Sequence, residues 1–383
     1  MKFSVHKKDI HEKLQFLIGL VPSKANMMVL SNFKLKTEKC DNKLIIIGTD
    51  LNITTIVKLT ANVLDDCEFL VNARNLADII NSLPDASINF TLNEESLNIE
   101  CGTSSFSMNC VDVSLFPEIA IIDSEQEYKC DSENFKKMIN NTVFATSSDP
   151  NQTIISGVYC KIEDSLITFA ATDTKRISES KLKTNFIINE PYEIVIPPRA
   201  LTFLEKNINA IAKEMKNLDS GLPEIVLKYD TRRISFQLND VILISNRYEG
   251  RFPTYSVAFR HQPNSTLILD KARLRDAINR ASLFFEDEDR LIKITLSNSE
   301  IVVESHLFDG RVAKDSINEF TYDGPDTIYC FNSKLFIGIL GALETTEVIL
   351  KFRSNEEPIW ILNTTDMENM EVRFILMPIR IGR

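Results

Sequence analysis

The sequence lacks the patterns on which common enzyme classes depend. Its 383 residues include only 11 glycines, 4 histidines and 1 tryptophan. There is no Gly-x-Gly-x-x-Gly segment, no phosphate-binding Gly-Lys-Ser/Thr loop and no Gly-x-Ser-x-Gly segment. A nucleotide-dependent enzyme or a serine hydrolase of the usual kind is therefore not indicated.

Paired cysteines and long apolar runs are also missing. The seven cysteines are an odd set without Cys-x-x-Cys spacing, which favours reduced thiols over a disulfide framework. Residues 1–9 lack the apolar core of a signal peptide, and no later run reaches membrane-spanning length. We therefore expect a soluble cytoplasmic protein.

Candidate metal ligands are few. His6 and His11 are five residues apart, which is wrong for two ligands on one helical face. We expect these two, His261 and His306 to have structural roles. The acidic segment 286–289 has no glycine to shape a calcium loop, so a solvated turn is favoured. The sequence predicts no metal, no cofactor and no catalytic residue.

Two aspartates resemble a catalytic pair at first sight. Asp50 follows Gly48-Thr49, and Asp173 follows Ala171-Thr172, each directly after an apolar strand. Because they recur at the same point of two repeats, we interpret both as turn-forming residues. An enzyme built from repeats, with its site at a domain joint, is the competing hypothesis, and it needs convergent catalytic groups that the sequence does not offer.

What the chain does contain is one order of residues repeated three times. The repeats open at Phe3, Tyr128 and Leu267 and close at Phe116-Pro117, Phe252-Pro253 and Met377-Pro378. We place three domains at 1–122, 123–254 and 255–383. Each reads as two halves of one strand, one helix and three strands, joined by hairpin-length turns. The fold class is therefore α+β with mainly antiparallel sheets.

Charge is divided unevenly between helices and strands. The predicted helices are 7–20, 73–82, 132–142, 198–217, 270–281 and 333–343. They contain 15 Lys and Arg against 8 Asp and Glu, whereas the rest of the chain has 28 against 46. The net charge of −11 thus divides into +7 and −18. If all helices face one way, the protein has one basic and one acidic surface.

A series of short motifs carries a resemblance over the whole chain. They are Met1-Lys2-Phe3-Ser4-Val5, Gly48-Thr49-Asp50-Leu51, Leu115-Phe116-Pro117, the segment from Ala171 to Ile177, the segment from Gly250 to Tyr255, and Met377-Pro378-Ile379-Arg380-Ile381. In this order they resemble the bacterial β sliding clamp, the processivity subunit of DNA polymerase III. The resemblance implies three clamp domains joined head to tail and a homodimeric ring around duplex DNA. It also implies a non-enzymatic function and no sequence preference.

Basic residues near the helices match the DNA-facing positions that the resemblance implies. They are Lys24, Arg74, Arg199, Lys334, Lys7, Lys8, Lys136, Lys137, Arg273 and Arg275. Arg74, Arg199 and Lys334 fall at equivalent points of the three second helices. A ring holds DNA topologically, so these charges need only permit sliding over phosphates.

The resemblance also implies a partner-peptide pocket between the second and third domains. Matching positions are Ile155, Thr172, Lys175, Arg176, Ile177, Pro253, Ile375, Met377, Pro378, Ile379 and Arg380. Implied partners are the polymerase catalytic subunit, clamp-loader subunits and other proteins with a clamp-binding motif. We expect Met and Ile to form apolar walls, and Arg176 and Arg380 to hold a peptide's polar ends. A buried last strand is the plain alternative for the tail.

Three features depart from the family pattern. Thr174-Lys175 stand where the family usually has Gly-His, and Gly382-Arg383 extend the tail. The implied ring interface pairs Phe106 and Met108 with Leu283 and Phe284 of a second copy, but 308–315 replaces an acidic stretch. The alternatives that stay open are a monomeric clamp-like scaffold and a divergent paralogue without ring closure.

Overall fold

The structure is a computed structural model. It describes residues 1–383 except 23–26, 125, 150, 187, 189, 216–222, 261, 286–289, 307–308, 366–367 and 381–383. Lys24, His261, the acidic segment 286–289, Phe308 and the Ile381–Arg383 tail therefore lie outside the described residues.

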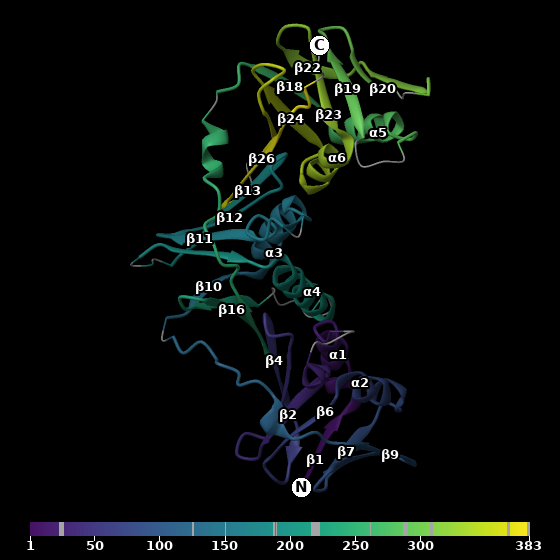
Figure 1. The fold of residues 1–383 in the computed structure, drawn as a ribbon, viewed down its shortest axis with the longest axis vertical. Helices are drawn as coiled ribbons and strands as arrows, with labels where there is room; N and C mark the ends of the chain where they lie inside the picture. The colour runs from purple at the N-terminus through teal and green to yellow at the C-terminus, as the bar shows by residue number, and fades with distance from the viewer. Residues whose placement is uncertain are drawn as a thin grey trace. The chain divides into compact units, whose positions relative to one another are not determined.

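The helices are those that the periodicity predicts (Figure 1). In the described part of the chain they are α1 (Lys7–Ile18), α2 (Ala73–Ser82), α3 (Ser132–Thr142), α4 (Pro198–Met215), α5 (Lys271–Ala281) and α6 (Ser333–Ala342). Short 3-10 turns, which the pattern did not indicate, are η1 (Met28–Ser31), η2 (Val113–Leu115), η3 (Val143–Ala145) and η4 (Tyr255–Phe259). The helix predictions are confirmed to within two residues wherever both ends are described.

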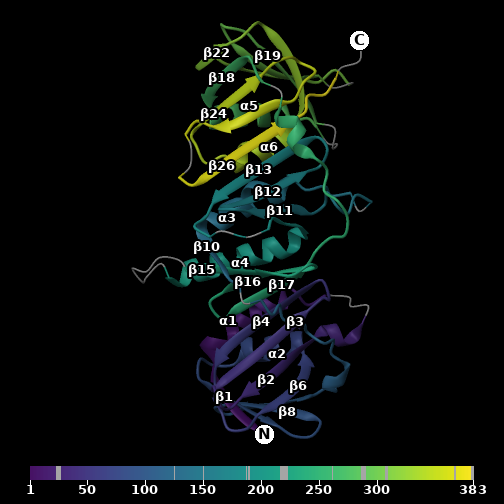
Figure 2. The ribbon, with the colours of Figure 1, turned by 90° about the vertical axis from the view of Figure 1, so that its left-hand side faces the viewer.

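The chain divides into two compact units, 1–132 with 203–247, and 133–202 with 248–383. The first unit contains two sheets. One has the order β5 (Asn62–Val63), β1 (Lys2–His6), β7 (Ser87–Leu92), β8 (Ser96–Cys101), β9 (Ser104–Asn109). The other has the order β10 (Tyr128–Asp131), β15 (Glu224–Tyr229), β16 (Arg233–Leu238), β17 (Val241–Asn246), β4 (Ile53–Thr60), β3 (Lys43–Thr49), β2 (Asn32–Glu38), β6 (Cys67–Asn72). Figure 2 shows β16, β17, β4 and β3 side by side.

The second compact unit repeats this plan. Its larger sheet has the order β14 (Tyr192–Ile196), β11 (Val158–Glu163), β12 (Leu166–Thr172), β13 (Arg176–Lys183), β26 (Met370–Leu376), β25 (Ile359–Asn363), β24 (Glu347–Phe352), β18 (Ser265–Asp270), β22 (Phe320–Asp323). Its smaller sheet has the order β21 (Val312–Ile317), β20 (Ile301–His306), β19 (Leu291–Leu296), β23 (Thr327–Asn332). The strand–helix–three-strand halves are confirmed, and β5 and β22 are short additions that the pattern missed.

The large sheets join neighbouring repeats. β4 of the first repeat pairs with β17 of the second, and β13 of the second pairs with β26 of the third. All paired strands in the described residues run antiparallel, as predicted. Because each joint is a continuous hydrogen-bonded ladder, the compact units cut through the middle repeat. The three domain boundaries drawn from the repeats stay a prediction.

Helix ends follow the sequence chemistry. Asn72 and Asn332 cap α2 and α6, and each side-chain oxygen accepts from a backbone N–H three residues on. At the other end of α2, the Lys7 ammonium donates to the carbonyl of Asn81 at 2.9 Å and to that of Leu83. Lys271 does the same to the carbonyl of Leu343, just after α6, at 2.7 Å. These lysines satisfy carbonyls that a helix end leaves unpaired.

The helices cover one face of each sheet. In the first compact unit, Leu14 and Leu17 of α1 share a buried core with Ile46, Val57 and Val241 from three strands. The next residues along those strands point to the opposite face, as alternation requires. There Ile56 and Ile244 form a separate apolar cluster with Ile122. The first joint therefore has two distinct apolar faces.

Candidate functional sites

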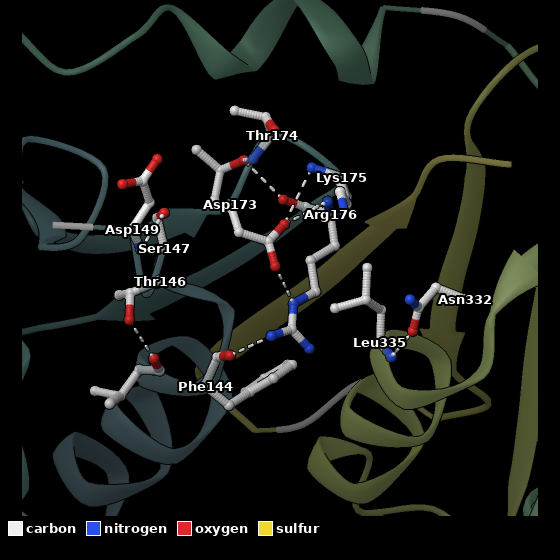
Figure 3. A network of polar contacts seen from close by, with 12 residues as sticks. Phe144, Thr146, Ser147, Asp149, Asp173, Thr174, Lys175, Arg176, Asn332 and Leu335 are labelled. Atoms are coloured by element: carbon white, nitrogen blue, oxygen red, sulfur yellow. Dashed lines mark hydrogen bonds and ion pairs between the residues drawn. The ribbon is translucent and has the colours of Figure 1, made fainter. Parts of the chain in front are cut away.

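The predicted peptide pocket begins at the tight turn between β12 and β13. The Asp173 carboxylate accepts from the backbone N–H of Lys175 and of Arg176, each at 3.0 Å (Figure 3). The Thr172 hydroxyl donates to the carbonyl of Arg176 at 2.7 Å. Thr174 has a φ of 73°, a conformation that a β-branched residue rarely adopts. The turn role of Asp173 is confirmed. Lys175, in the same turn, is exposed.

Asp50 forms the same turn in the first repeat. Its carboxylate accepts from the backbone N–H of Asn52 at 3.0 Å and of Ile53 at 2.8 Å. Leu51, at the position equivalent to Thr174, has a φ of 76°. The turn interpretation of both aspartates is therefore confirmed. Both turns carry a side chain where glycine costs least, so the first two repeats share this backbone strain.

The Arg176 side chain is turned into the protein. Its Nε donates to Asp173 at 3.0 Å and its Nη2 donates to the carbonyl of Phe144 at 2.5 Å, with the guanidinium 4.9 Å from the Phe144 ring (Figure 3). A Cβ on Gly338 of α6 would lie 2.8 Å from Nη1. Burial lowers the pKa of Arg176, against the opposing effect of Asp173. The side chain is only 11% exposed, and its polar contacts here are within the protein; the expectation that it holds a peptide's end stays a prediction.

The C-terminal segment completes one wall of this region. Ile375 of β26 pairs with Ile177 of β13, and the backbone N–H of Met377 donates to the carbonyl of Lys175 at 2.9 Å. Two residues later, the N–H of Ile379 donates to the carbonyl of Cys330 at 2.7 Å. The strand ends buried at Leu376, whereas Met377 and Ile379 are 40% and 42% exposed. The tail is thus more than a buried last strand.

Of three further pocket positions, one is buried and two are exposed. Ile155 is buried in a cluster with Phe252, and Pro253 follows Phe252 and is exposed. The backbone N–H of Ser147, three residues after Phe144, donates to the carbonyl of Ile155 at 2.9 Å. Arg380 is exposed and lies 3.7 Å from a carboxylate oxygen of Glu356. Arg380 therefore has the solvent access that Arg176 lacks.

A buried ionic cluster beside these residues was missed from the sequence. Glu179 is 3% exposed. It accepts from Arg373 Nε at 2.9 Å and from the Tyr255 hydroxyl at 2.9 Å, and Lys181 lies 3.3 Å away. Burial, followed by Glu179, raises the pKa of Tyr255. Glu179 and Arg373 are direct ladder partners across the second joint, a pairing that distance in sequence concealed.

The basic helix residues differ in how far their charges are engaged. Lys8, Arg74 and Lys334 are exposed, with no carboxylate within 4 Å among the described residues. Lys7 is bound to the end of α2, as described above. Lys137 lies 3.4 Å from Glu344, Arg273 lies 3.1 Å from Glu319, and Arg275 lies 3.4 Å from Asp276. Arg199 is exposed and Lys136 is half-buried.

Two of the four predicted ring-interface residues lie on an edge strand of the described sheets, and the other two follow a helix. β9 carries Phe106 and Met108, which pack partly against the core, and it is the last strand of its sheet. β21 is the first strand of the smaller sheet in the second compact unit. Leu283 and Phe284 follow α5 and are 75% and 38% exposed. The Arg311 guanidinium lies 5.6 Å from the Phe284 ring.

Structural roles also account for two of the histidines. The His6 ring accepts from the backbone N–H of Lys8 and lies 3.5 Å from Asp85, and His11 is 2.9 Å from the Asn81 amide oxygen. No group of three or more His, Cys, Asp or Glu side chains arranged for a metal occurs among the described residues. No helix in the described parts is long and apolar enough to span a membrane.

Comparison with protein-family models accounts for nearly the whole chain. Residues 1–120, 129–254 and 258–380 match the N-terminal, central and C-terminal domains of the DNA polymerase III beta subunit. The chain belongs to this family. Family members are beta sliding clamps, processivity factors that act without catalysing a reaction. The recognition made from the motif series is therefore confirmed, together with the three-domain α+β fold.

Individual relatives align with this chain over their full lengths. The beta sliding clamps of Rickettsia felis and Synechococcus elongatus are 26% and 24% identical, each over 100% of both chains. The crystal structure of the sliding clamp from Bacillus subtilis has a TM-score of 0.90 at 22% identity and covers 100% of both chains. A Pseudomonas aeruginosa clamp bound to griselimycin also has a TM-score of 0.90, at 20% identity and full coverage of both chains.

Proposed function

We propose that two copies of this chain close into a ring around duplex DNA in the cytoplasm. In this proposal the ring tethers the replicative polymerase and other partners, which gives DNA synthesis its processivity. The membership of the chain in the sliding-clamp family supports the function. The arrangement of its sheet edges supports the closure.

One observation carries ring closure. At both internal joints, the last strand of a repeat's first half pairs with the last strand of the next repeat's second half: β4 with β17, and β13 with β26. The same rule leaves β21 and β9 as the remaining pair, and both are free edges. An exposed edge presents unpaired backbone groups that favour pairing with another chain. The third kind of joint then forms between two copies.

Repeat equivalence also predicts the register of that joint. Equivalent residues pair at the internal joints: Thr55 with Leu243, and Ser178 with Phe374. Counted from the hairpins, the matching residues of the free edges are Ala313 and Phe106. With these two opposite each other, Phe106 lies on the core face of its sheet, on the side of α5 and of the exposed Leu283 that follows this helix.

The exposed basic residues of the helices suit a lining for DNA. Lys8, Arg74 and Lys334 come from the first and third repeats and are free of carboxylates among the described residues. Contacts with phosphates carry no sequence information, so such a lining permits sliding. Because closure holds the DNA, these charges matter mainly when the ring is loaded.

Retention on DNA of different topology tests the proposal. We expect the protein, loaded by its clamp loader, to stay on nicked circular DNA in high salt and to leave within minutes of linearisation. A variant with Lys8, Arg74 and Lys334 changed to Ser should load severalfold less well with an unchanged melting temperature, because the substituted side chains are exposed. Equal retention on linear and circular DNA would contradict a closed ring.

We further propose that partner peptides bind beside the C-terminal tail, over Met377, Ile379 and Lys175. The exposed apolar tail next to a turn held rigid by Arg176 supports this site. Met377→Asp is expected to weaken a labelled peptide from the polymerase's clamp-binding segment by about tenfold or more, about 1.4 kcal/mol. Fluorescence anisotropy measures this. The matched control is Leu64→Asp, at a 52% exposed site in the other compact unit; equal weakening by both variants would refute the site.

A further inference from the structure

A second apolar site lies on the large sheet of the first compact unit. Residues of β2, β3, β4, β17, β16 and β15, together with Ile121 and Ile122 of the connector after the first repeat, line a hollow of about 430 Å³. That volume is within the usual range of ligand sites. The hollow is on the face opposite α1, because Ile45, Ile56 and Ile242 alternate with residues buried under that helix.

The floor of the hollow is a row of isoleucines across the first joint. Ile47, Ile56 and Ile242 are successive ladder partners on three neighbouring strands, and Ile45 and Ile244 flank them. Aliphatic side chains therefore form one continuous stripe perpendicular to the strands. The lining residues reach over six neighbouring strands, about 24 Å at the usual spacing. An extended peptide of about seven residues has that length.

The second joint has an equivalent pair of ladder positions, and there the connector covers them. Glu179 and Arg373 stand where the first joint has Ile56 and Ile242, counted from equivalent hairpins. The connector over them inserts Tyr255, which bonds Glu179, and Phe259, whose ring lies 4.4 Å from the Arg373 guanidinium. The connector of the second joint thus covers the Glu179–Arg373 pair.

The connector over the first joint leaves its isoleucines partly uncovered. Of its residues, Ile122 is buried, but Ile121 is 62% exposed. Arg233 donates to the carbonyl of Ala120 and pairs with Asp230, so the connector is held in place beside the hollow. The hollow is therefore a shaped feature of the sheet and the connector together.

The charge around the hollow identifies the kind of ligand. Lys36, Lys58 and Lys228 line it with a single acidic residue, Glu38. Lys36 and Lys58 flank Ile45 on one side of the isoleucine row, and Lys228 is on the other side, aligned with Ile244. Lys58 is exposed, with no carboxylate within 4 Å among the described residues. Lys36 is paired with Glu38 at 2.8 Å and Lys228 with the exposed Glu127 at 3.0 Å. The three lysines therefore exceed these two carboxylates by one positive charge, carried by Lys58, and in a chain of net charge −11 this favours an anionic partner.

We propose that this hollow is a second docking site, which takes an extended segment of a partner protein with aliphatic side chains between acidic residues. The aliphatic side chains lie on the isoleucine row. One carboxylate pairs with Lys58 on one side, and another replaces the exposed Glu127 as the partner of Lys228 on the other side. The site differs from the pocket at the tail in residues and in compact unit. It does not depend on DNA being encircled.

Selection of peptides on the intact protein tests the proposal. A phage library of random 12-residue peptides is selected on the immobilised full chain, with an excess of polymerase clamp-binding peptide to block the tail site. We expect clones enriched in Asp and Glu around Leu, Ile or Val, with affinities that fall as salt rises. Lys58→Glu and Ile121→Asp should each weaken such a clone by about tenfold.

Matched variants keep the result specific. Lys39→Glu makes the same charge change at an exposed position outside the hollow, and Leu64→Asp matches the apolar change; both should alter affinity by less than about twofold. Failure to recover acidic clones that depend on Lys58 and Ile121 overturns the proposal. Binding of oleate in a Lys58-dependent manner, without such peptides, also overturns it and assigns the hollow to an anionic lipid. Either result leaves the DNA-retention test unaffected.

Discussion

Replacing Phe106 with arginine is expected to leave the chain folded but unable to form a ring. Phe106 lies on the edge strand β9 and is only partly packed against its own core. In the inferred joint it meets Ala313 and the exposed Leu283 of a second copy. An aromatic anchor at the centre of an interface contributes at least about 2 kcal/mol, and a charge placed there adds a desolvation cost. We therefore expect the dimer dissociation constant to rise by a factor of about 30 or more.

Light scattering at micromolar concentration measures this directly. The wild-type protein should have about twice the chain mass of 43.6 kDa, and Phe106→Arg should have the mass of one chain. Retention on circular DNA should fall in parallel. Leu64→Arg is the matched control and should stay dimeric. A wild-type protein that is monomeric under these conditions would favour the alternative of a clamp-like scaffold, which the altered 308–315 stretch keeps open.

Loss of Glu179 is expected to have the largest effect on stability. Its carboxylate is buried and holds Arg373, Tyr255 and Lys181 together across the second joint. Glu179→Ala removes the buried partner and leaves Arg373 with the exposed Glu371, 3.3 Å away, as its remaining carboxylate among the described residues. Breaking a buried pair in this way costs about 3 kcal/mol. Thermal unfolding should report a lower melting temperature, and added salt should recover little of the loss.

The first joint supplies the control for this prediction. The equivalent ladder position there carries Ile56 and Ile242. Changing both Glu179 and Arg373 to Ile replaces the ion pair with an apolar pair that this fold already tolerates. Replacement of a buried ion pair by apolar residues is often neutral, so the double variant should be more stable than Glu179→Ala. The single variants Glu179→Ile and Arg373→Ile complete this comparison. If their losses of unfolding free energy add up to the loss in the double variant, the two side chains are not coupled.

Much of the fold follows from local patterns. The 3.6-residue spacing of Ile10, Leu14 and Leu17 predicts α1, and Asn72 marks the start of α2 by its capping side chain. Short alternating runs with tight turns predict antiparallel strands. The repeats of these patterns predict three equivalent domains, and the order of the motifs led to the right family. These features depend on neighbours within a few residues, which is why a single sequence reveals them.

The candidate sites were predicted less completely. The sequence placed Ile177 and Ile375 in one site, and the ladder between β13 and β26 brings them together. It did not predict that Arg176 would turn inward to Phe144, or that Lys7 would be used at the end of α2. Both side chains donate to backbone carbonyl groups, and a pattern of side chains in the sequence does not show where these carbonyls lie. The direction of a long side chain is set by such partners, which lie far away along the chain.

The threefold repeat of the sequence therefore determined the secondary structure and the number of domains. The residue counts determined the basic character of the helices. Tertiary structure alone decided what distinguishes one joint from the other. Glu179 meets Arg373, and Ile56 meets Ile242, only because strands of different repeats pair in one register. In one joint the connector covers an ion pair, and in the other the isoleucines line an apolar hollow. Pairing between distant strands depends on the whole sheet, so these contacts had to be read from the structure.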